Sequence, residues 1–261
     1  MSLRLGNNDI IAIMGATGSG KTTFLQLLNG LLQPTRGKIF IDNKSIFDSD
    51  FPIDRLRTRI GMVFQFPEMQ FFEENVFKDV AYGPQNLGLD RGEVLRRVKT
   101  ALEAVDLDYA SYHQKSPFHL SSGEKRRLAI ACILALDPEM LILDEPTIGL
   151  DWVSSMKIEK IILDLHKQGR TVIFVTHDMN LVTRIARQVI ILDRGSVVFK
   201  GKKQELLSNH KILKTYNLPF PDIMEFMNKI KKAGIPIDSK VYSLPQAKKE
   251  LDKVLQNSQY Q

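Results

Sequence analysis

The strongest chemical signal in this chain is a glycine-rich stretch near its N-terminus. Gly15–Thr22 reads Gly-Ala-Thr-Gly-Ser-Gly-Lys-Thr and fits the pattern G-x-x-x-x-G-K-[ST] at every fixed position. In such a loop successive backbone N–H groups point at one anion, and the following helix N-terminus adds positive potential. Lys21 would reach the β- and γ-phosphates, and the Thr22 hydroxyl would bind Mg²⁺. The residues predicted to bind the triphosphate are Gly15, Ala16, Thr17, Gly18, Ser19, Gly20, Lys21, Thr22 and Thr23.

An acidic pair, Asp144–Glu145, is the second signal. It directly follows the apolar run Leu141–Leu143. Two carboxylates at the end of a buried strand are costly unless a cation lies nearby. We therefore predict that Asp144 holds Mg²⁺ and that Glu145 polarises an attacking water as general base.

Two other apolar runs end in polar side chains. Gln65 follows residues 60–64, where its amide would order water or bind Mg²⁺. His177 follows residues 171–176. It is predicted either to contact a phosphate oxygen or to be a hydrogen-bonded histidine of the core.

The segment Leu120–Glu124 predicts a helix start. Ser121 is the expected cap, and Glu124 three residues later completes a capping box. A helix N-terminus that offers Ser121, Ser122 and the N–H of Gly123 is a candidate anion site. By itself the pattern is common and weakly specific.

The elements that must position these residues alternate between strand and helix. This alternation predicts an α/β fold with a mainly parallel sheet flanked by helices. The region 75–120 is mainly helical, and its first helix is expected to stop near Gly83–Pro84. Residues 188–193 and 196–200, joined by Arg194–Gly195, predict a hairpin. The expected strands are 10–14, 38–41, 60–65, 139–145 and 171–175, and the expected C-terminal helices are 202–216, 222–233 and 244–255.

Composition excludes several classes of protein. The chain has 261 residues, 43% hydrophobic, and a net charge of +6. No apolar run approaches the ~18–20 residues of a membrane span, and no secretion signal is visible. The single cysteine, Cys132, excludes an internal disulfide and suits the cytosol. Because no basic tract is interleaved with aromatics, we expect no nucleic-acid partner.

Taken in order, these motifs resemble the nucleotide-binding subunits of ABC transporters. The resemblance implies a P-loop NTPase core with an ABC-type helical subdomain at about residues 66–135. It also implies ATP and Mg²⁺ as cofactors, and a head-to-tail dimer in which Ser121–Gly123 of one subunit contacts ATP bound to the other. It assigns Glu145 as base, His177 as sensor of the γ-phosphate, Asp151 as coupler of the two sites and Gln65 as link to a membrane partner.

A narrower resemblance is to the ATPases of energy-coupling-factor (ECF) transporters. It rests on Phe64–Phe72, on Asp79–Pro84 and on a tail with Leu218–Pro221, Gly234–Ile237 and Leu244–Pro245. It implies an ATPase domain at 1–200 and a C-terminal helical extension at 201–261, implicated in pairing of ATPases. The implied function is import of a vitamin or transition-metal ion, at the cytoplasmic face of the membrane, with a second ATPase and an integral membrane component as partners.

The aromatics of the first stretch, Phe66, Phe71 and Phe72, have two interpretations. They form either the core of the helical subdomain or a groove for a partner's helix, which we favour.

Several positions depart from the family pattern. Ser122 stands where glycine is usual, Glu124 where glutamine is common, and Trp152 where proline is usual. Fourteen residues precede Gly15, and Met1–Met14 contains no aromatic that would stack on adenine. We therefore expect either that the N-terminal strands of the family are truncated here or that adenine is held in another way.

The sequence also leaves other functions open. The chain could serve another class of ABC transporter, or be a soluble ABC-type ATPase acting on DNA or ribosomes. Only about a hundred residues, without sustained heptads, separate the phosphate loop from Ser121, which argues against a DNA-organising ATPase with a long coiled coil. A regulatory protein without turnover is disfavoured by Glu145.

Overall fold

The computed structural model describes residues 2–48, 51–238 and 241–258. The chain divides into two compact units. The larger unit comprises residues 4–10 and 20–175, and the smaller unit comprises the first three residues, 11–19 and 176–261.

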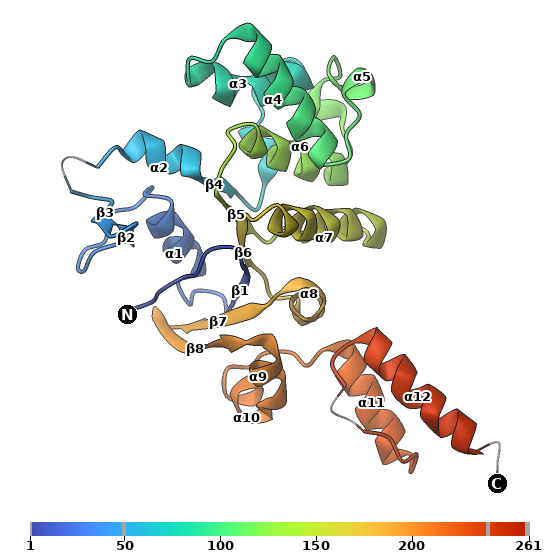
Figure 1. The fold of residues 1–261 in the computed structure, drawn as a ribbon. Coiled ribbons are helices and arrows are strands. Elements are labelled where there is room, and N and C mark those ends of the chain that lie inside the picture. Colours follow the sequence, from blue (N-terminus) through green and yellow to red (C-terminus); the bar gives the residue numbers. More distant parts are fainter. Residues whose placement is uncertain (1, 49–50, 239–240, 259–261) are drawn as a thin grey trace. The chain divides into compact units, whose positions relative to one another are not determined.

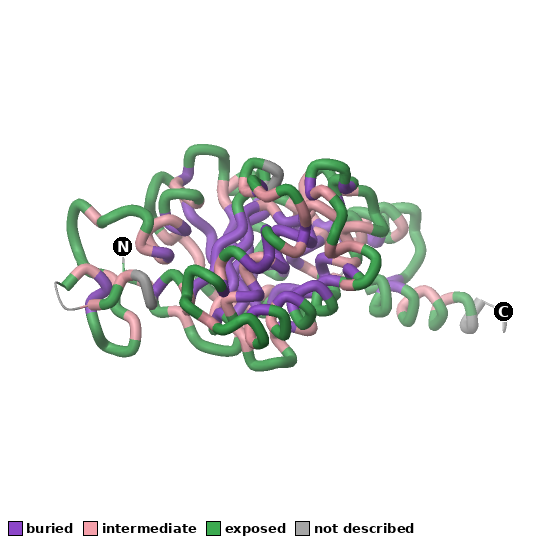
Figure 2. The backbone as a smooth tube through the Cα atoms, turned by 90° about the horizontal axis from the view of Figure 1, so that it is seen from above, coloured by how far each residue is buried: buried purple, intermediate pink, exposed green. Residues whose placement is uncertain are grey.

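Three parallel strands form the centre of the larger unit. They are β4 (Ile60–Val63), β5 (Met140–Asp144) and β6 (Thr171–Val175), with Gly61 opposite Leu141 and Leu141 opposite Val172. Nearly every residue in them is buried, as Figure 2 shows in purple, because strands covered on both faces need continuous apolar sequence. Since the strands run in parallel, their polar ends meet at one edge.

A group of helices follows β4 in the larger unit. Helices α3, α4, α5 and α6 lie together in the green part of Figure 1. Contrary to the predicted stop near Pro84, α3 continues to Asn86. Gly83 is in close contact with Leu136, since a Cβ at Gly83 would lie 2.7 Å from Leu136 Cδ2. The elements of this unit outside the sheet are α1 (Lys21–Leu28), β2 (Phe40–Ile41), β3 (Lys44–Ser45), α2 (Ile53–Arg59), a 3₁₀ turn (Pro67–Gln70), α3 (Val76–Asn86), α4 (Arg91–Ala104), α5 (Tyr109–Tyr112), a second 3₁₀ turn (Pro117–His119), α6 (Ser122–Leu134) and α7 (Trp152–Lys167).

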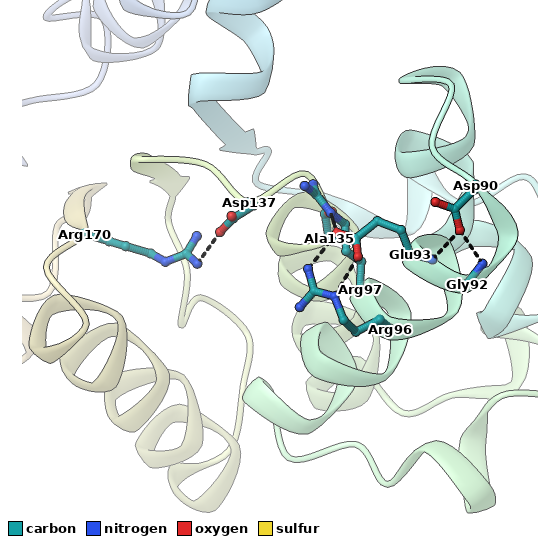
Figure 3. Close-up of polar contacts among 8 residues, drawn as sticks. All are labelled: Asp90, Gly92, Glu93, Arg96, Arg97, Ala135, Asp137 and Arg170. Carbon is teal, nitrogen blue, oxygen red and sulfur yellow. Dashed lines mark hydrogen bonds and ion pairs between the residues drawn. The ribbon is translucent and has the colours of Figure 1, made fainter.

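Helix α4 is fixed at its start and along its length (Figure 3). Asp90 Oδ1 accepts hydrogen bonds from the N–H groups of Gly92 and Glu93, at 2.8 and 3.0 Å. Arg97 donates through Nε to Glu93, at 2.9 Å, and through Nη1 to the carbonyl of Ala135 at the end of α6, at 3.2 Å. The Asp90 and Glu93 bonds thus stabilise α4 itself, and the bond from Arg97 to Ala135 ties α4 to the end of α6.

The smaller unit contains β1 from Ile11 onward, paired in parallel with β7 (Gln188–Asp193), and β8 (Ser196–Lys202) antiparallel to β7. The predicted hairpin at Arg194–Gly195 is confirmed. The helix expected at 202–216 is instead two helices separated by Asn209, which caps the second. The helices of this unit are α8 (Met179–Ile185), α9 (Lys203–Ser208), α10 (His210–Thr215), α11 (Asp222–Lys232) and α12 (Leu244–Ser258). Strand β1 as a whole spans Ile10–Met14.

The end of the chain has a small core of its own. Met227, Ile237, Val241 and Ala247 are buried together, with side chains of α11 and α12 packed around them. The apolar face of each helix therefore finds its partner within this terminal segment.

Gly61→Ala is expected to destabilise the larger unit. A Cβ there would lie 2.1 Å from Ile133 Cγ2, so α6 would have to move away from β4. Overpacking of this kind costs about 1–3 kcal/mol of unfolding free energy, measurable by urea denaturation. Gly6→Ala, where no heavy atom lies within 4 Å, is the matched control. Equal stability of the two variants would contradict this packing.

Candidate functional site

Four residues predicted from separate motifs interact in the larger unit. The Thr22 hydroxyl donates a hydrogen bond to Asp144, and the charge of Lys21 interacts with both Glu145 and Asp144. Lys21 and Thr22 open α1, whereas Asp144 ends β5. The helix start and the strand end therefore bring together a cation, a hydroxyl and two carboxylates.

Burial disfavours the charged forms of two groups in this site, Asp144 and Lys21. Burial raises the pKa of Asp144, whose residue is 7% exposed, and the neighbouring charge of Glu145 raises it further. Lys21 and the Thr22 hydrogen bond act in the opposite direction. Burial lowers the pKa of Lys21, against the attraction of both carboxylates. Because burial disfavours the charged forms of both Asp144 and Lys21, this group is suited to an additional cation and a polyanion.

The donors fit magnesium. Thr22, Asp144 and Gln65 offer only oxygen ligands of the hard type, and Mg²⁺ characteristically takes one or two carboxylates and keeps several waters. Within the described ranges there is no group of three or more His, Cys, Asp and Glu side chains that would hold a metal by protein ligands alone. The residues present therefore suit a water-rich Mg²⁺ site rather than a closed zinc site.

Glu145 has an unusual backbone. Its φ of +48° lies in the left-handed region, which a non-glycine residue occupies at a cost of about 1 kcal/mol or more. Its N–H donates to the carbonyl of Val175 at 3.0 Å, and its carbonyl accepts from Arg126. Hydrogen bonds on both sides of the residue hold this conformation.

Arg126 is a site residue that the sequence reading missed. It is 6% exposed, and its guanidinium donates to the carbonyls of Gln65 at 2.7 Å, Glu145 at 3.4 Å and Ile148 at 3.4 Å. One buried cation on α6 thus holds the segments that follow β4 and β5. The available signal was a charged pair, Arg126–Arg127, immediately before the apolar run from Leu128.

The predicted capping box at the start of α6 is confirmed. The Ser121 N–H and hydroxyl both donate to Glu124 Oε2, at 2.8 and 2.7 Å, and the Glu124 N–H donates back to Ser121 Oγ. Ser121 and Ser122 are exposed. The N-terminus of α6 therefore presents hydroxyl groups to solvent.

The third member of this segment, Gly123, is buried against α7. A Cβ on Gly123 would lie 2.5 Å from Ser154 Oγ, so only glycine fits. Asp151 caps α7 by accepting from the Ser154 N–H at 2.9 Å and hydroxyl at 2.7 Å. Trp152, in the usual proline position, is the first residue of this helix. Asp151 and the segment Ser121–Gly123 are therefore in contact through Ser154.

Most of the glycine-rich loop belongs to the smaller unit. Gly15 passes so close to β7 that a Cβ would lie 2.1 Å from the carbonyl oxygen of Leu192. The Ser19 carbonyl accepts from the Gly195 N–H at 3.0 Å, and residues 16–18 are exposed. Among the described residues the buried Ser19 hydroxyl has no hydrogen-bond partner, as expected of a group that awaits a ligand.

The loop then continues into the larger unit. Gly20 has φ +98° immediately before α1, and Thr23 is exposed in the first turn of this helix. A left-handed glycine at this position ends the loop and lets the helix begin at Lys21.

His177 lies in the smaller unit. It is exposed, so the core-histidine interpretation is wrong. Its neighbours hold the backbone: the Thr176 N–H donates to Ile13 O at 3.2 Å, and the Asp178 N–H donates to Thr176 Oγ1 at 3.0 Å. His177 is thus presented at the start of α8, whose cap is Asp178.

Apolar side chains are exposed on the segment after Gln65. The rings of Phe72 and Tyr82 meet edge to face, with centroids 4.7 Å apart, and Met69 is 83% exposed. Phe71, in contrast, is buried, so the core interpretation holds for Phe71 and is wrong for the exposed Phe66 and Phe72. That the two exposed rings form a groove for a partner's helix stays a prediction. We call this surface the aromatic face; it consists of Phe64, Phe66, Met69, Phe72 and Tyr82.

Asp79 fixes the backbone at one residue of the aromatic face, Phe72. Its Oδ1 accepts from the N–H groups of Phe72 and Glu73, at 3.3 and 3.2 Å. The residue is 6% exposed, and Oδ2 has no partner among the described residues. Burial raises the pKa of this carboxyl despite the two hydrogen bonds.

Comparison with known proteins agrees with this geometry. Residues 1–148 match the family described as ABC transporter. The chain therefore belongs to the ABC transporter family. Within it, the chain is 44% identical over 257 residues to the energy-coupling factor transporter ATP-binding protein EcfA2 of Clostridioides difficile, covering 98% of this chain and 89% of the relative. It is also 40% identical over 241 residues to EcfA of Methanocaldococcus jannaschii, covering 91% and 85%.

Solved structures give the same result. CbiO1 from Clostridium perfringens, described as part of the ABC transporter complex cbiONQ, matches with a TM-score of 0.75 and 36% identity, over 87% of this chain and 90% of that one. The ATP-binding cassette MJ0796, a dimer in a post-hydrolysis state bound to ADP and Pi, matches with a TM-score of 0.67 and 30% identity, over 77% and 88%. The α/β fold of an ABC ATPase cassette is confirmed. Among the residues that the structure describes, no helix is both long and apolar enough to cross a bilayer.

Asp79→Asn is expected to change how stability depends on pH. Because burial raises the pKa of Asp79 in the folded state, its contribution is fully present below the unfolded pKa and is lost as pH rises through the folded pKa. The asparagine variant keeps an acceptor for the N–H groups of Phe72 and Glu73, and it does not lose this stability as pH rises. The free energy of unfolding of the variant relative to the parent, measured in urea, should therefore be greater at pH 7 than at pH 4.

The exposed Glu103→Gln, in the same unit, is the control and should show no such difference. A relative stability of Asp79→Asn that is greater at pH 4 than at pH 7 would show that the ionised carboxylate is the stabilising form.

Proposed function

We propose that this chain is the ATP-binding and ATP-hydrolysing subunit that powers import of a micronutrient, a vitamin or transition-metal ion, through an ECF-type ABC transporter. The observation that carries the proposal is the interaction of Lys21 and Thr22 with Asp144 and Glu145. The high identity to ECF ATP-binding proteins over nearly the whole chain supports the transporter class.

Each residue of the site has a part in hydrolysis. Backbone N–H groups of Gly15–Thr22 bind the phosphates, Lys21 neutralises the β- and γ-phosphates, and Thr22 and Asp144 hold Mg²⁺. When bound, Mg²⁺ neutralises charge that develops on the phosphates. Glu145 accepts a proton from the water that attacks the γ-phosphorus, while the bond to ADP breaks.

Gln65 and His177 complete this proposal. Gln65 orders the water or binds Mg²⁺, and its backbone hydrogen bond to Arg126 ties it to the same helix as Ser121. His177, exposed at the start of α8, contacts a γ-phosphate oxygen. Both side chains sense whether ATP or ADP is present.

The working unit is a head-to-tail dimer with an identical or related subunit. Ser121, Ser122 and Gly123 of one subunit contact ATP held by the other, where the start of α6 favours an anion. Asp151, in contact with this segment through Ser154, couples the two sites. The solved structures of the related cassette MJ0796 are dimeric, which supports the pairing of two subunits.

The aromatic face is proposed to receive the integral membrane component. A set of exposed aromatic side chains suits an amphipathic helix of a partner. The subunit would then lie at the cytoplasmic face of the membrane as a peripheral protein. The domain division follows the same scheme: residues 1–200 form the ATPase, with the helical subdomain at about 66–135, and residues 201–261 form an extension that pairs ATPases.

Glu145→Gln is expected to trap an ATP-bound dimer. Removal of a general base lowers turnover by about 10²–10⁴-fold while nucleotide binding is retained. Size-exclusion chromatography with ATP and Mg²⁺ should give a dimer that persists, and phosphate release should fall. The exposed Glu103→Gln is the control and should hydrolyse ATP like the parent. Parental turnover in Glu145→Gln would show that another group is the base.

Met69→Glu is expected to weaken binding of the membrane component. The charge would be desolvated on the aromatic face, whereas Met69 is too exposed for the fold to depend on it. Co-expression with the genomic neighbours and purification from detergent should recover at least about tenfold less membrane protein, or about 1.4 kcal/mol.

Leu163→Glu, a partly exposed apolar position on α7, is the matched control and should leave recovery unchanged. Recovery of DNA or ribosomes instead of a membrane protein would favour a soluble ABC-type ATPase.

A further inference from the structure

Glu124 is hydrogen-bonded on both of its oxygens. Oε2 accepts from the Ser121 N–H and hydroxyl, whereas Oε1 accepts from the hydroxyl of Tyr112 at 2.6 Å. A capping box needs only the first set. The bond from Tyr112 is an addition from a different element, α5.

Tyr112 is itself held from several sides. The ammonium group of Lys115 lies 4.0 Å from the centre of its ring. The adjoining backbone is tied to the start of α3, because the Val76 N–H donates to Lys115 O and the Phe77 N–H donates to His113 O, each at 2.9 Å. The Tyr112 hydroxyl is therefore a fixed donor rather than a mobile surface group.

The hydrogen bond from Tyr112 to Glu124 requires a charged carboxylate and a neutral phenol, and the pKa values of both groups favour these states. The bond from Tyr112, together with the hydrogen bonds from Ser121, lowers the pKa of Glu124 to about 2, and it raises the pKa of Tyr112. At neutral pH Glu124 is therefore an acceptor with full charge, and Tyr112 is a neutral donor.

From these contacts we propose that Tyr112 is a positioning residue of the ATPase, which holds the Glu124 carboxylate and thereby sets Ser121 and the start of α6 for the triphosphate of the second subunit. The inference rests on the proposed function, because Ser121 meets ATP only in the head-to-tail dimer. Without the Tyr112 hydroxyl, Glu124 loses the bond that fixes Oε1. Its carboxylate can then rotate away from Ser121, the residue that is proposed to face the triphosphate of the second subunit.

Tyr112→Phe tests this directly, because the ring and its contact with Lys115 remain. Turnover at saturating ATP should fall about fivefold, which corresponds to the net contribution of one typical intramolecular hydrogen bond. The affinity of the single subunit for a fluorescent ATP analogue should not change, because the phosphate loop is intact. Tyr109→Phe is the matched control: Tyr109 lies on the same helix, its ring stacks on His113, and its hydroxyl has no hydrogen bond among the described residues.

A second variant separates positioning from a loss of fold. In Glu124→Gln the side chain that caps the helix is a neutral amide. In that background Tyr112→Phe should lower turnover by less than half as much as it does when Glu124 is present. A double-mutant cycle in turnover measures this difference. Equal penalties in the two backgrounds, or a Tyr112→Phe variant with parental turnover, would overturn the inference.

The two proposals fail in different ways. If Glu145→Gln forms no ATP-dependent dimer, the proposed function falls and this inference falls with it. If that dimer forms and Tyr112→Phe still behaves like Tyr109→Phe, only the role of Tyr112 is wrong.

Discussion

Two adjacent carboxylates at the end of a buried strand are the constraint on which this structure depends. Burial raises the pKa of Asp144 and the adjacent charge of Glu145 raises it further, so positive charge nearby is needed to favour the ionised Asp144 carboxylate. The chain supplies it from two helices, as Lys21 at the start of α1 and Arg126 within α6. The burial of these charged groups also favours the binding of Mg²⁺ and a polyanion, which we propose. The Mg²⁺ and ATP that we propose to bind here would interact directly with these groups.

Helix α6 connects the parts of the site. Its interior holds Arg126, which bonds the carbonyls after β4 and β5, and its first turn packs Gly123 against Ser154. A shift of this helix would therefore move the backbone at Gln65 and at Glu145 together. Because such hydrogen bonds are directional and buried, the helix and the two loops are expected to move as one body. This gives the start of α6 a physical connection to Glu145, the proposed general base.

The aromatic face is continuous in sequence with the site. Gln65 ends one segment and Phe66 begins the next, so a partner bound to the face acts on residues adjoining the proposed Mg²⁺ ligand. Exposed rings are unfavourable in water. The backbone at one of these rings, Phe72, is nevertheless held in place by the buried carboxyl of Asp79, which also binds the N–H of Glu73. The fold retains this unfavourable surface, which is understandable if a partner covers it.

The sequence by itself determined the local parts of this protein. The glycine-rich loop, the acidic pair and the Ser121–Glu124 cap each depend on neighbours within a few residues, so their chemistry is written in consecutive positions. Only the tertiary structure decided which distant groups meet them. Arg126 reaches Gln65 across 61 positions and Tyr112 reaches Glu124 across 12. Packing likewise decided that Phe71 is buried and the adjacent Phe72 is exposed. It also decided that α3 continues through Pro84 to Asn86. Such contacts arise from how elements pack, and no spacing along the chain encodes them.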